Sequence, residues 1–239
     1  MRFWLLQGDT KKAIEKIKAA LKWRQDFGVA DLVKCFQAEP DDADSPLGKL
    51  RDMMDRENET GKIYVRGYDK DGRALMIMRS ARENTHVEQD NMKHLVWNLE
   101  KAIACTAKKS KELGASTPLD KINLVIDYAG FKLSNAPPMS TTKFTLDVLQ
   151  KHYPERMYRI YCVNPPFVFQ AFWGIVRPFV DPVTKEKIVF CSGKKQLESN
   201  LHKNIAALDK LEPVLGGPAP ENFESKAYLR LPHDECWDE

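Results

Sequence analysis

The feature that most constrains the fold of this chain is a regular alternation of strand-like and helix-like segments after residue 61. An Asp-Gly turn at 69–72 joins the first two strands, which are therefore expected to form a hairpin. Apolar runs separated by amphipathic helices follow, and they predict an α/β fold with a mostly parallel sheet and right-handed crossovers. The expected strands are 63–68, 74–78, 122–128, 157–163 and 188–191, and the expected helices are 90–109, 141–152, 167–176 and 196–208.

The N-terminal part of the chain has a different pattern. Residues 1 to about 38 are predicted to be helical, and the first helix ends at a glycine, Gly28. The stretch 40–46, rich in proline and aspartate, is typical of a linker. We therefore expect a small N-terminal helical lobe at 1–45 and a larger domain at 46–239.

One charged residue of this first helix lies where an apolar residue is expected. Ala13, Ile17 and Leu21 share a helical face, and Arg24 falls near the middle of that face. Because burying an unpaired charge is very costly, Arg24 needs an anionic partner or must extend to the edge of the face. A bound anionic ligand and a carboxylate of the core are both open as partners.

Charge and cysteine usage exclude several classes of protein. The net charge of +3 is spread along the chain, so nothing favours nucleic acid as a partner. The five cysteines are dispersed without a C-x-x-C pair, which is typical of reduced, buried thiols. No apolar stretch approaches the roughly 20 residues that a membrane-spanning helix needs, so any membrane contact should be peripheral. We expect a cytoplasmic monomer.

The usual signatures of enzymes and metal sites are missing from the sequence. There is no G-x-G-x-x-G or Walker loop after a strand, no G-x-S-x-G elbow and no H-E-x-x-H pair, and the histidines are dispersed. No cofactor or metal is therefore expected. Asp127, at the end of the buried strand, is the remaining candidate for catalysis, and a structural aspartate at a strand end is the simpler interpretation.

The segment from Cys162 to Val176, CVNPPFVFQAFWGIV, has no charged residue. Its prolines can start a helix whose side chains are apolar nearly all round. One interpretation is a buried crossover helix. The other is a helix with one face on a cavity and the other on a bilayer, which its large aromatic side chains suit.

Several motifs together carry a family resemblance. They occur in order at 22–28 (KWRQDFG), 71–73 (DGR), 126–130 (IDYAG), 153–156 (YPER), 164–166 (NPP) and 178–188 (PFVDPVTKEKI). With them the chain resembles the CRAL-TRIO family of lipid-binding proteins, and more closely its secretory phosphatidylinositol/phosphatidylcholine transfer branch. The resemblance covers nearly the whole chain. It implies a mostly parallel sheet that floors a lipid cavity, with flanking helices and a truncated N-terminal helical lobe.

The resemblance also implies positions for the ligand, which would be a bound phospholipid, namely phosphatidylinositol. The inositol-phosphate headgroup would be held by Arg24, Glu155, Thr184 and Lys187, whose cationic and carboxylate groups suit a phosphodiester and sugar hydroxyls. Arg24 could instead act by shaping the site. The resemblance places a gate over the acyl chains, with cavity contacts from Phe167, Phe169, Phe172, Trp173, Val176 and Phe179.

Three positions depart from the family pattern. Where the family holds phosphatidylcholine with tyrosine, serine and threonine hydroxyls, this chain has Met76, Ile122 and Leu124. Apolar side chains cannot hydrogen-bond a phosphate. We therefore expect phosphatidylinositol binding to be kept, phosphatidylcholine binding to be weak, and these three residues to form a pocket for a different second ligand.

The expected function is thus a phosphatidylinositol transfer protein that encloses one phospholipid and exchanges or presents it during transient contact with membranes. One alternative is a carrier of another hydrophobic ligand, such as a sterol, retinoid or tocopherol. Another is a lipid-sensing regulator that presents phosphatidylinositol to a phosphatidylinositol kinase. The alternative from a different class is an α/β enzyme that uses Asp127.

Overall fold

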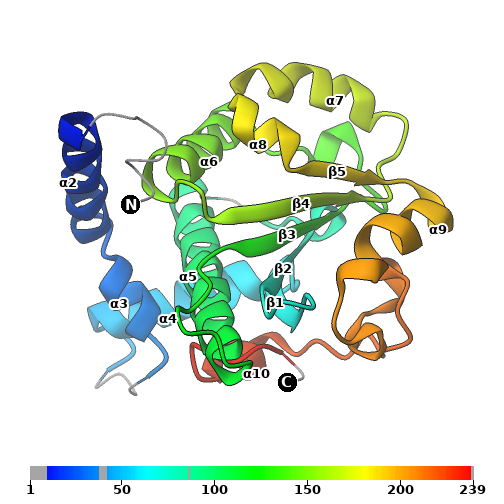
Figure 1. Ribbon diagram of the computed structural model, residues 1–239. Helices are drawn as coiled ribbons and strands as arrows, with labels where there is room; N and C mark the ends of the chain where they lie inside the picture. Colours follow the sequence, from blue (N-terminus) through cyan, green and yellow to red (C-terminus); the bar gives the residue numbers. More distant parts are fainter. Residues whose placement is uncertain (1–9, 38–41, 86, 238–239) are drawn as a thin grey trace.

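The computed structural model describes residues 10–37, 42–85 and 87–237, and a five-stranded sheet forms its centre (Figure 1). The strand order along the sheet is the order in the sequence, with β1 and β2 antiparallel and every later pair parallel. The prediction of a mostly parallel sheet is therefore confirmed. The strands are β1 (Ile63–Tyr68), β2 (Ala74–Arg79), β3 (Ile122–Asp127), β4 (Met157–Val163) and β5 (Ile188–Cys191).

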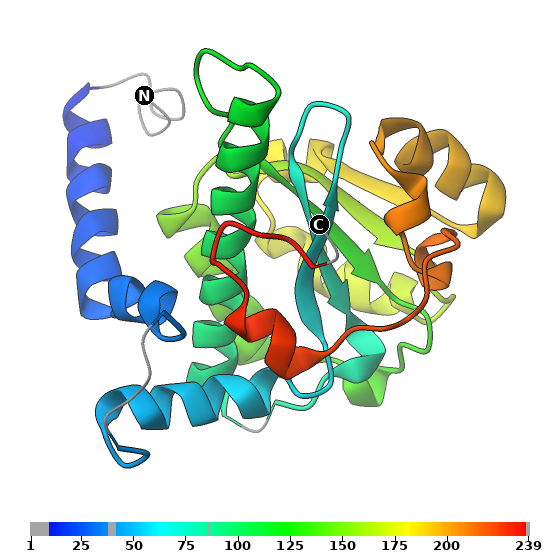
Figure 2. The same ribbon diagram turned by 90° about the horizontal axis from the view of Figure 1, so that it is seen from below.

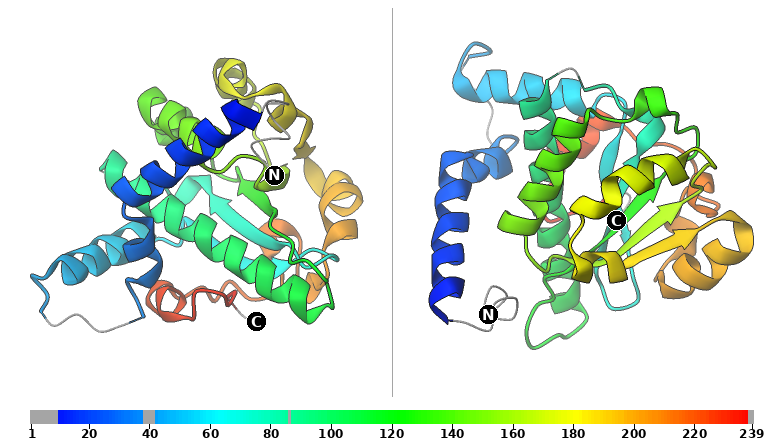
Figure 3. Two further views of the ribbon diagram at one scale, coloured as in Figure 1. Left: turned by 60° about the vertical axis from the view of Figure 1, so that its left-hand side comes forward. Right: turned by 90° about the horizontal axis from the view of Figure 1, so that it is seen from above.

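Helices cover both faces of this sheet. The long helix α5 packs against β1 and β2, and α3 and α4 pack against α5 on the same side (Figure 2). The opposite face carries α6, α7 and α8, which lie above the strands in Figure 1 and in front of them in the right panel of Figure 3. The bounds are α3 (Val29–Lys34), α4 (Pro46–Asn58), α5 (Glu88–Glu112), α6 (Met139–His152), α7 (Phe169–Val176) and α8 (Pro182–Glu186).

The periodicity of α5 explains its place under the sheet. Met92, Leu95, Val96 and Leu99 follow the i, i+3, i+4, i+7 spacing of one helical face, and all four are buried. Full burial of each such side chain contributes about 1.5–3 kcal/mol of transfer free energy. The β3 strand has a nearly continuous apolar sequence because layers of structure cover it on both faces.

The first described helix, α2 (Thr10–Asp26), lies at the side of the molecule, where it packs against α3 and α6 (Figures 2 and 3). Its predicted end at Gly28 is confirmed: Gly28 has φ 73° and starts a new turn before α3. The domain boundary at residue 45 stays a prediction, and residues 1–9 of the expected lobe lie outside the described residues.

The predicted helix 196–208 is confirmed only in part, because the helical turns end at Asn204 and are not one regular α-helix. The chain instead forms the short helix α9 (Gly193–Gln196), a π-helical turn at Leu197–Leu201 and a 3-10 turn at His202–Asn204. The backbone is then extended at Ile205, which pairs with Asp69 in the turn between β1 and β2. A helix continuing past Asn204 would lose this long-range pairing, which local periodicity does not reveal.

Three α-helices of the described residues, α4, α8 and α10 (Ser225–Arg230), were absent from the predictions. The segment of α4 carries a start signal, because Ser45 caps the helix by accepting a hydrogen bond from the N–H of Gly48 and Pro46 occupies the first turn. Helix α10 lies beyond the Gly216-Gly217 break and packs against α4. The five cysteines all lie in the described part of the chain, are buried and form no disulfide bond, as expected.

Candidate ligand-binding cavity

A cavity of about 890 Å³ lies between the sheet and the layer formed by α6, α7 and α8. Its floor comes from side chains of β2, β3 and β4, and its walls come from the three helices. Most of this lining is apolar, as in sites for hydrophobic ligands. The floor residues are Met76, Met78, Leu124, Ile126 and Ile160, and the apolar wall includes Leu146, Leu149, Phe172, Trp173 and Val176.

Helix α7 closes this cavity with an aromatic cluster. Phe169 is buried, and its ring lies 4.3 Å from that of Tyr128. Phe172 packs at 5.5 Å against Phe131, and Trp173 packs at 6.0 Å against Phe190. Phe169, Phe172 and Trp173 line the cavity, as the resemblance implies, and so do Val176 and Phe179.

The outer side of the same region is apolar and exposed to solvent. Phe167 is 93% exposed and lies in the turn before α7, outside the cavity lining, whereas the resemblance placed it with the cavity contacts. Ile175 is 57% exposed and also lies outside the lining, whereas Phe179 and Val183 are exposed to solvent and line the cavity as well. The α7 segment therefore has one apolar face toward the cavity and another toward solvent.

Three of the four predicted headgroup residues meet at one end of the cavity. Glu155, Thr184 and Lys187 all line it, and the Lys187 ammonium donates to the Glu155 carboxylate at 2.8 Å. Thr184 lies in the first turn of α8, where its backbone N–H donates to the capping carboxylate of Asp181. This cluster combines a cation, a carboxylate and a hydroxyl in one small polar region.

Glu155 is held in an uncommon backbone conformation. Its φ of 56° lies in the left-handed region, which costs a non-glycine residue about 1–3 kcal/mol and persists where the surroundings impose it. Burial alone would raise the pKa of the Glu155 carboxyl, but Lys187 and Lys121 outweigh burial and hold the pKa below its ordinary value. The residue is therefore an anion that accepts hydrogen bonds at this end of the cavity.

Lys121 was missed by the sequence analysis. Its ammonium lies 3.5 Å from the same Glu155 oxygen that Lys187 contacts. A signal for it exists in the sequence, because Lys121 directly precedes one predicted strand just as Lys187 directly precedes another. Residues that precede neighbouring parallel strands meet at one edge of the sheet.

Arg24 lies outside the lining of the cavity. Its guanidinium donates to the Glu100 carboxylate at 2.6 Å and to the Tyr153 hydroxyl at 3.3 Å, and the hydrogen bond with Glu100 is the main reason that the pKa of Arg24 is raised. Tyr153 does line the cavity and itself donates to Glu100 at 2.6 Å. Arg24 thus has a carboxylate of the protein as its partner and reaches the cavity wall through Tyr153.

Of the three residues expected to form a second-ligand pocket, two line the cavity and one does not. Met76 and Leu124 line the cavity, whereas Ile122 is fully buried outside its lining.

The end of the cavity opposite Glu155 is polar, and the sequence analysis did not predict it. It lies where β2 ends, and its polar lining residues are Lys62, Arg79, Ser80, Glu83 and Asn91.

Asp127 is buried away from the cavity and has several partners. Its carboxylate accepts hydrogen bonds from Arg79 Nε at 3.0 Å and from the backbone N–H of Ala129 at 2.9 Å. Burial raises the pKa of Asp127 although these hydrogen bonds act in the other direction. Such a carboxylate ties the end of β3 to β2 and to the following turn.

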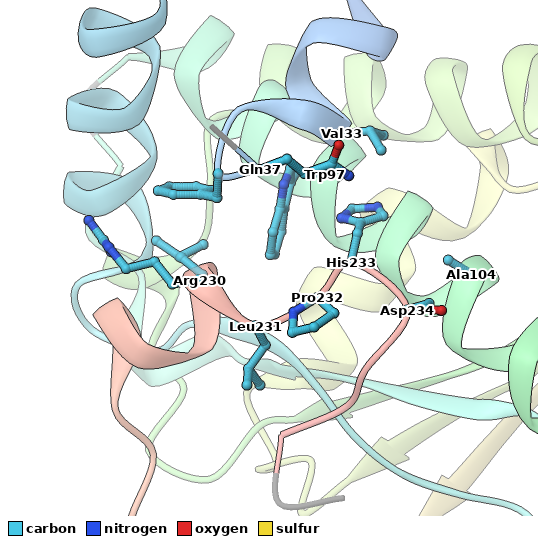
Figure 4. A pocket seen from close by; sticks show the side chains of 11 residues that line it. Val33, Gln37, Trp97, Ala104, Arg230, Leu231, Pro232, His233 and Asp234 are labelled. Atoms are coloured by element: carbon cyan, nitrogen blue, oxygen red, sulfur yellow. The ribbon is translucent and has the colours of Figure 1, made fainter. Parts of the chain in front are cut away.

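A second hollow, of about 530 Å³, lies between α3, α5 and the C-terminal segment (Figure 4). His233 packs edge-on against Trp97 there at 5.2 Å, and burial lowers the pKa of His233 to about 4. Both His233 ring nitrogens and Trp97 Nε1 are closed off from solvent and have no hydrogen-bond partner among the described residues. Neighbouring atoms cover these nitrogens, so none of them is available to a ligand in the hollow. We therefore interpret the hollow as imperfect packing between α3, α5 and the C-terminal segment.

The described residues contain neither a membrane-spanning helix nor a cluster of metal ligands. No helix in residues 10–37, 42–85 or 87–237 is both long and apolar enough to cross a bilayer. Within the same residues, the metal-ligating side chains form no group of three that could hold a metal ion.

Comparison with curated proteins finds relatives of this chain in three fungi. The phosphatidylinositol transfer protein PDR17 of Saccharomyces cerevisiae is 32% identical over 187 residues, which cover 76% of this chain and 48% of PDR17. The SEC14 cytosolic factor of Kluyveromyces lactis is 28% identical over 233 residues, covering 91% of this chain and 69% of that protein. The CRAL-TRIO domain-containing protein C23B6.04c of Schizosaccharomyces pombe is 32% identical over 194 residues, covering 79% of this chain and 17% of that protein. This chain therefore spans less than half the length of PDR17 and of C23B6.04c.

The crystal structure of Sfh5 is similar in fold, with a TM-score of 0.65 and 17% sequence identity, and the match covers 95% of this chain and 76% of Sfh5. Residues 58–217 match the family described as the CRAL/TRIO domain. That match spans more than half of the chain and contains the whole sheet, helices α5 to α8 and Glu155, Thr184 and Lys187. The chain therefore belongs to the CRAL/TRIO domain family.

Proposed function

We propose that this protein encloses one phosphatidylinositol molecule and exchanges or presents it at membrane surfaces. The observation that carries this proposal is the cluster of Glu155, Thr184 and Lys187 at one polar end of a mostly apolar cavity. Acyl chains gain about 0.8 kcal/mol for each CH₂ that they bury, so the apolar walls supply most of the affinity. The mechanism needs no covalent chemistry.

The polar cluster matches the chemistry of an inositol phosphodiester. Lys187 can donate to phosphate oxygens, and the Thr184 hydroxyl can donate to the same group or to a sugar oxygen. The Glu155 carboxylate accepts hydrogen bonds and therefore suits inositol hydroxyls. The names of PDR17 and of other relatives as phosphatidylinositol transfer proteins support the same ligand.

Discrimination against phosphatidylcholine is the finer part of the proposal. Met76 and Leu124 present only a thioether and methyl groups to the cavity, so they offer no hydroxyl to a choline phosphate. The polar end near Lys62 and Arg79 favours a second ligand with a polar group of its own. We propose that this second ligand differs from phosphatidylcholine.

Lipids extracted from the purified protein test this assignment directly. Mass spectrometry should find phosphatidylinositol in roughly equimolar amount and little phosphatidylcholine, because the hydroxyl donors are replaced. Abundant phosphatidylcholine would contradict the proposed discrimination. A sterol, retinoid or tocopherol in place of phosphatidylinositol would contradict the proposed ligand.

Transfer and presentation can be separated with two assays on the same preparation. Movement of labelled phosphatidylinositol between vesicles measures transfer, whereas stimulation of a phosphatidylinositol kinase acting on vesicles measures presentation. A protein that transfers without stimulating the kinase is a carrier, and one that stimulates without net transfer is a presenting regulator.

The exposed apolar side of the α7 segment is proposed to contact the membrane. Phe167→Ser should lower binding to phospholipid vesicles about 10- to 100-fold, because burial of one large apolar side chain is worth about 1.5–3 kcal/mol. Vesicle co-sedimentation measures the effect. Leu113→Ser is the matched control, because it also replaces an exposed apolar side chain by serine, at the end of α5. This variant should bind vesicles as the wild type does. Equal losses in both variants would count against this docking surface.

A further inference from the structure

Three residues from different segments form a row at one edge of the sheet. Lys121 precedes β3, Glu155 lies just before β4, and Lys187 precedes β5. Because β3, β4 and β5 are parallel neighbours in this order, the residues before them lie side by side. The carboxylate of Glu155 therefore sits between two lysines.

Both ammonium groups approach the same oxygen atom. Lys187 Nζ lies 2.8 Å and Lys121 Nζ lies 3.5 Å from Glu155 Oε2. The side chains of Lys187 and Glu155 are mostly buried, at 17% and 18% exposure, whereas Lys121 is 40% exposed and does not line the cavity. Lys187 faces the cavity, and Lys121 approaches Glu155 from outside it.

The charges in this row explain why a second lysine is useful. Lys187 and Glu155 alone carry no net charge, so a phosphodiester placed beside them would meet Glu155 as a like charge. Addition of Lys121 makes the row a net cation, and the ligand's single negative charge then balances it. The positive charge of the adjacent Arg156 is left out of this balance, because its guanidinium lies 3.8 Å from the carboxylate of Asp120.

We propose that Lys121 is a positioning residue that neutralises Glu155, so that Lys187 can leave the carboxylate and bind an anionic phosphodiester. Lys121 thereby makes the site selective for anionic over zwitterionic lipids. This inference rests on the proposed function. It adds a residue that acts through Glu155 and does not touch the lipid.

A charge series at position 121 tests the role. Lys121→Met should reduce transfer of pyrene-labelled phosphatidylinositol about 3- to 5-fold, the range expected for a partly exposed ion pair. Lys121→Arg should restore transfer, and Lys121→Glu should reduce it further. Raising the salt concentration should shrink the difference between wild type and Lys121→Met, because exposed charges are screened.

Four controls separate this role from a structural or a membrane effect. Lys194→Met removes an exposed lysine, 90% exposed, in the helix that follows the opposite end of β5, and should leave transfer unchanged. The thermal unfolding midpoint and the vesicle co-sedimentation of Lys121→Met should equal those of the wild type. Transfer of pyrene-labelled phosphatidylcholine should not fall in parallel.

The outcomes are distinguishable from one another. Unchanged phosphatidylinositol transfer in Lys121→Met and Lys121→Glu would overturn the inference while leaving the proposed function intact. A loss of transfer that follows a loss of vesicle binding would also overturn it, because Lys121 would then act at the membrane. A wild-type protein that transfers no phosphatidylinositol and stimulates no kinase would overturn the proposed function itself.

Discussion

Lys187→Ala is expected to lower transfer of phosphatidylinositol about 10- to 100-fold while the protein stays folded. A hydrogen bond to a charged group contributes about 1.5–3 kcal/mol, which corresponds to that range of affinity. The loss should lie at its upper end, because the variant also leaves the Glu155 carboxylate, 2.8 Å from the missing ammonium, without its nearest cation. Lys121, 3.5 Å from that carboxylate, then neutralises it only in part, and the remaining negative charge opposes the phosphate.

Vesicle-to-vesicle transfer of labelled phosphatidylinositol measures this effect, with thermal unfolding as the test of folding. Lys185→Ala is the matched control, because Lys185 lies in the short helix α8, whose C-cap residue is Lys187, and does not line the cavity. We expect Lys185→Ala to transfer lipid at the wild-type rate. Wild-type transfer by Lys187→Ala, or equal losses in the two variants, would count against the assigned headgroup site.

Glu212→Ala is expected to lower the free energy of unfolding by about 3–5 kcal/mol, the cost of breaking a buried ion pair by removing one partner. Glu212 and Arg66 are each 1% exposed, and Arg66 Nη1 donates to the Glu212 carboxylate at 2.6 Å. Arg79 lies 3.3 Å from the same carboxylate, and the Tyr64 hydroxyl donates to it. The variant leaves two arginines beside a buried space from which the counter-charge has been removed.

Urea unfolding, followed by circular dichroism, measures this loss. Glu224→Ala, which removes an exposed carboxylate before α10, is the control and should change the free energy of unfolding by less than about 0.5 kcal/mol. A loss below about 1 kcal/mol for Glu212→Ala would mean that water or a local rearrangement compensates the arginines. The predicted role of Glu212 in joining the C-terminal segment to β1 would then be wrong.

The elements that sequence analysis predicted well are those whose periodicity agrees with their place in the fold. Strands 63–68, 157–163 and 188–191 were predicted at the bounds of β1, β4 and β5. Their apolar character comes from burial in the sheet. The segment 196–208 has a helical pattern too, but its end forms a bridge with the turn before β2, and this contact between distant residues overrides the local preference.

The residues of the candidate site also differ in how far the sequence could predict their positions. Thr184 and Lys187 belong to one continuous motif, so the sequence alone places them near each other, and the motif resemblance adds Glu155. Arg24 shows the limit: its position on an apolar face indicated an anionic partner, and only the tertiary structure identified that partner as Glu100, at 2.6 Å. A helical wheel gives the direction of a side chain but not the residue on the facing helix.

The amino-acid sequence by itself determined the α/β architecture, the mostly parallel sheet, the CRAL-TRIO motifs and the apolar segment over the cavity, because periodicity and short-range motifs encode all four. Tertiary structure alone decided which charges meet. The pairing of Lys121 with Glu155, of Arg24 with Glu100 and of Arg66 with Glu212 joins residues 34, 76 and 146 positions apart, respectively. Such pairs depend on strand order and helix packing, since electrostatic attraction follows distance in space and not separation in the sequence.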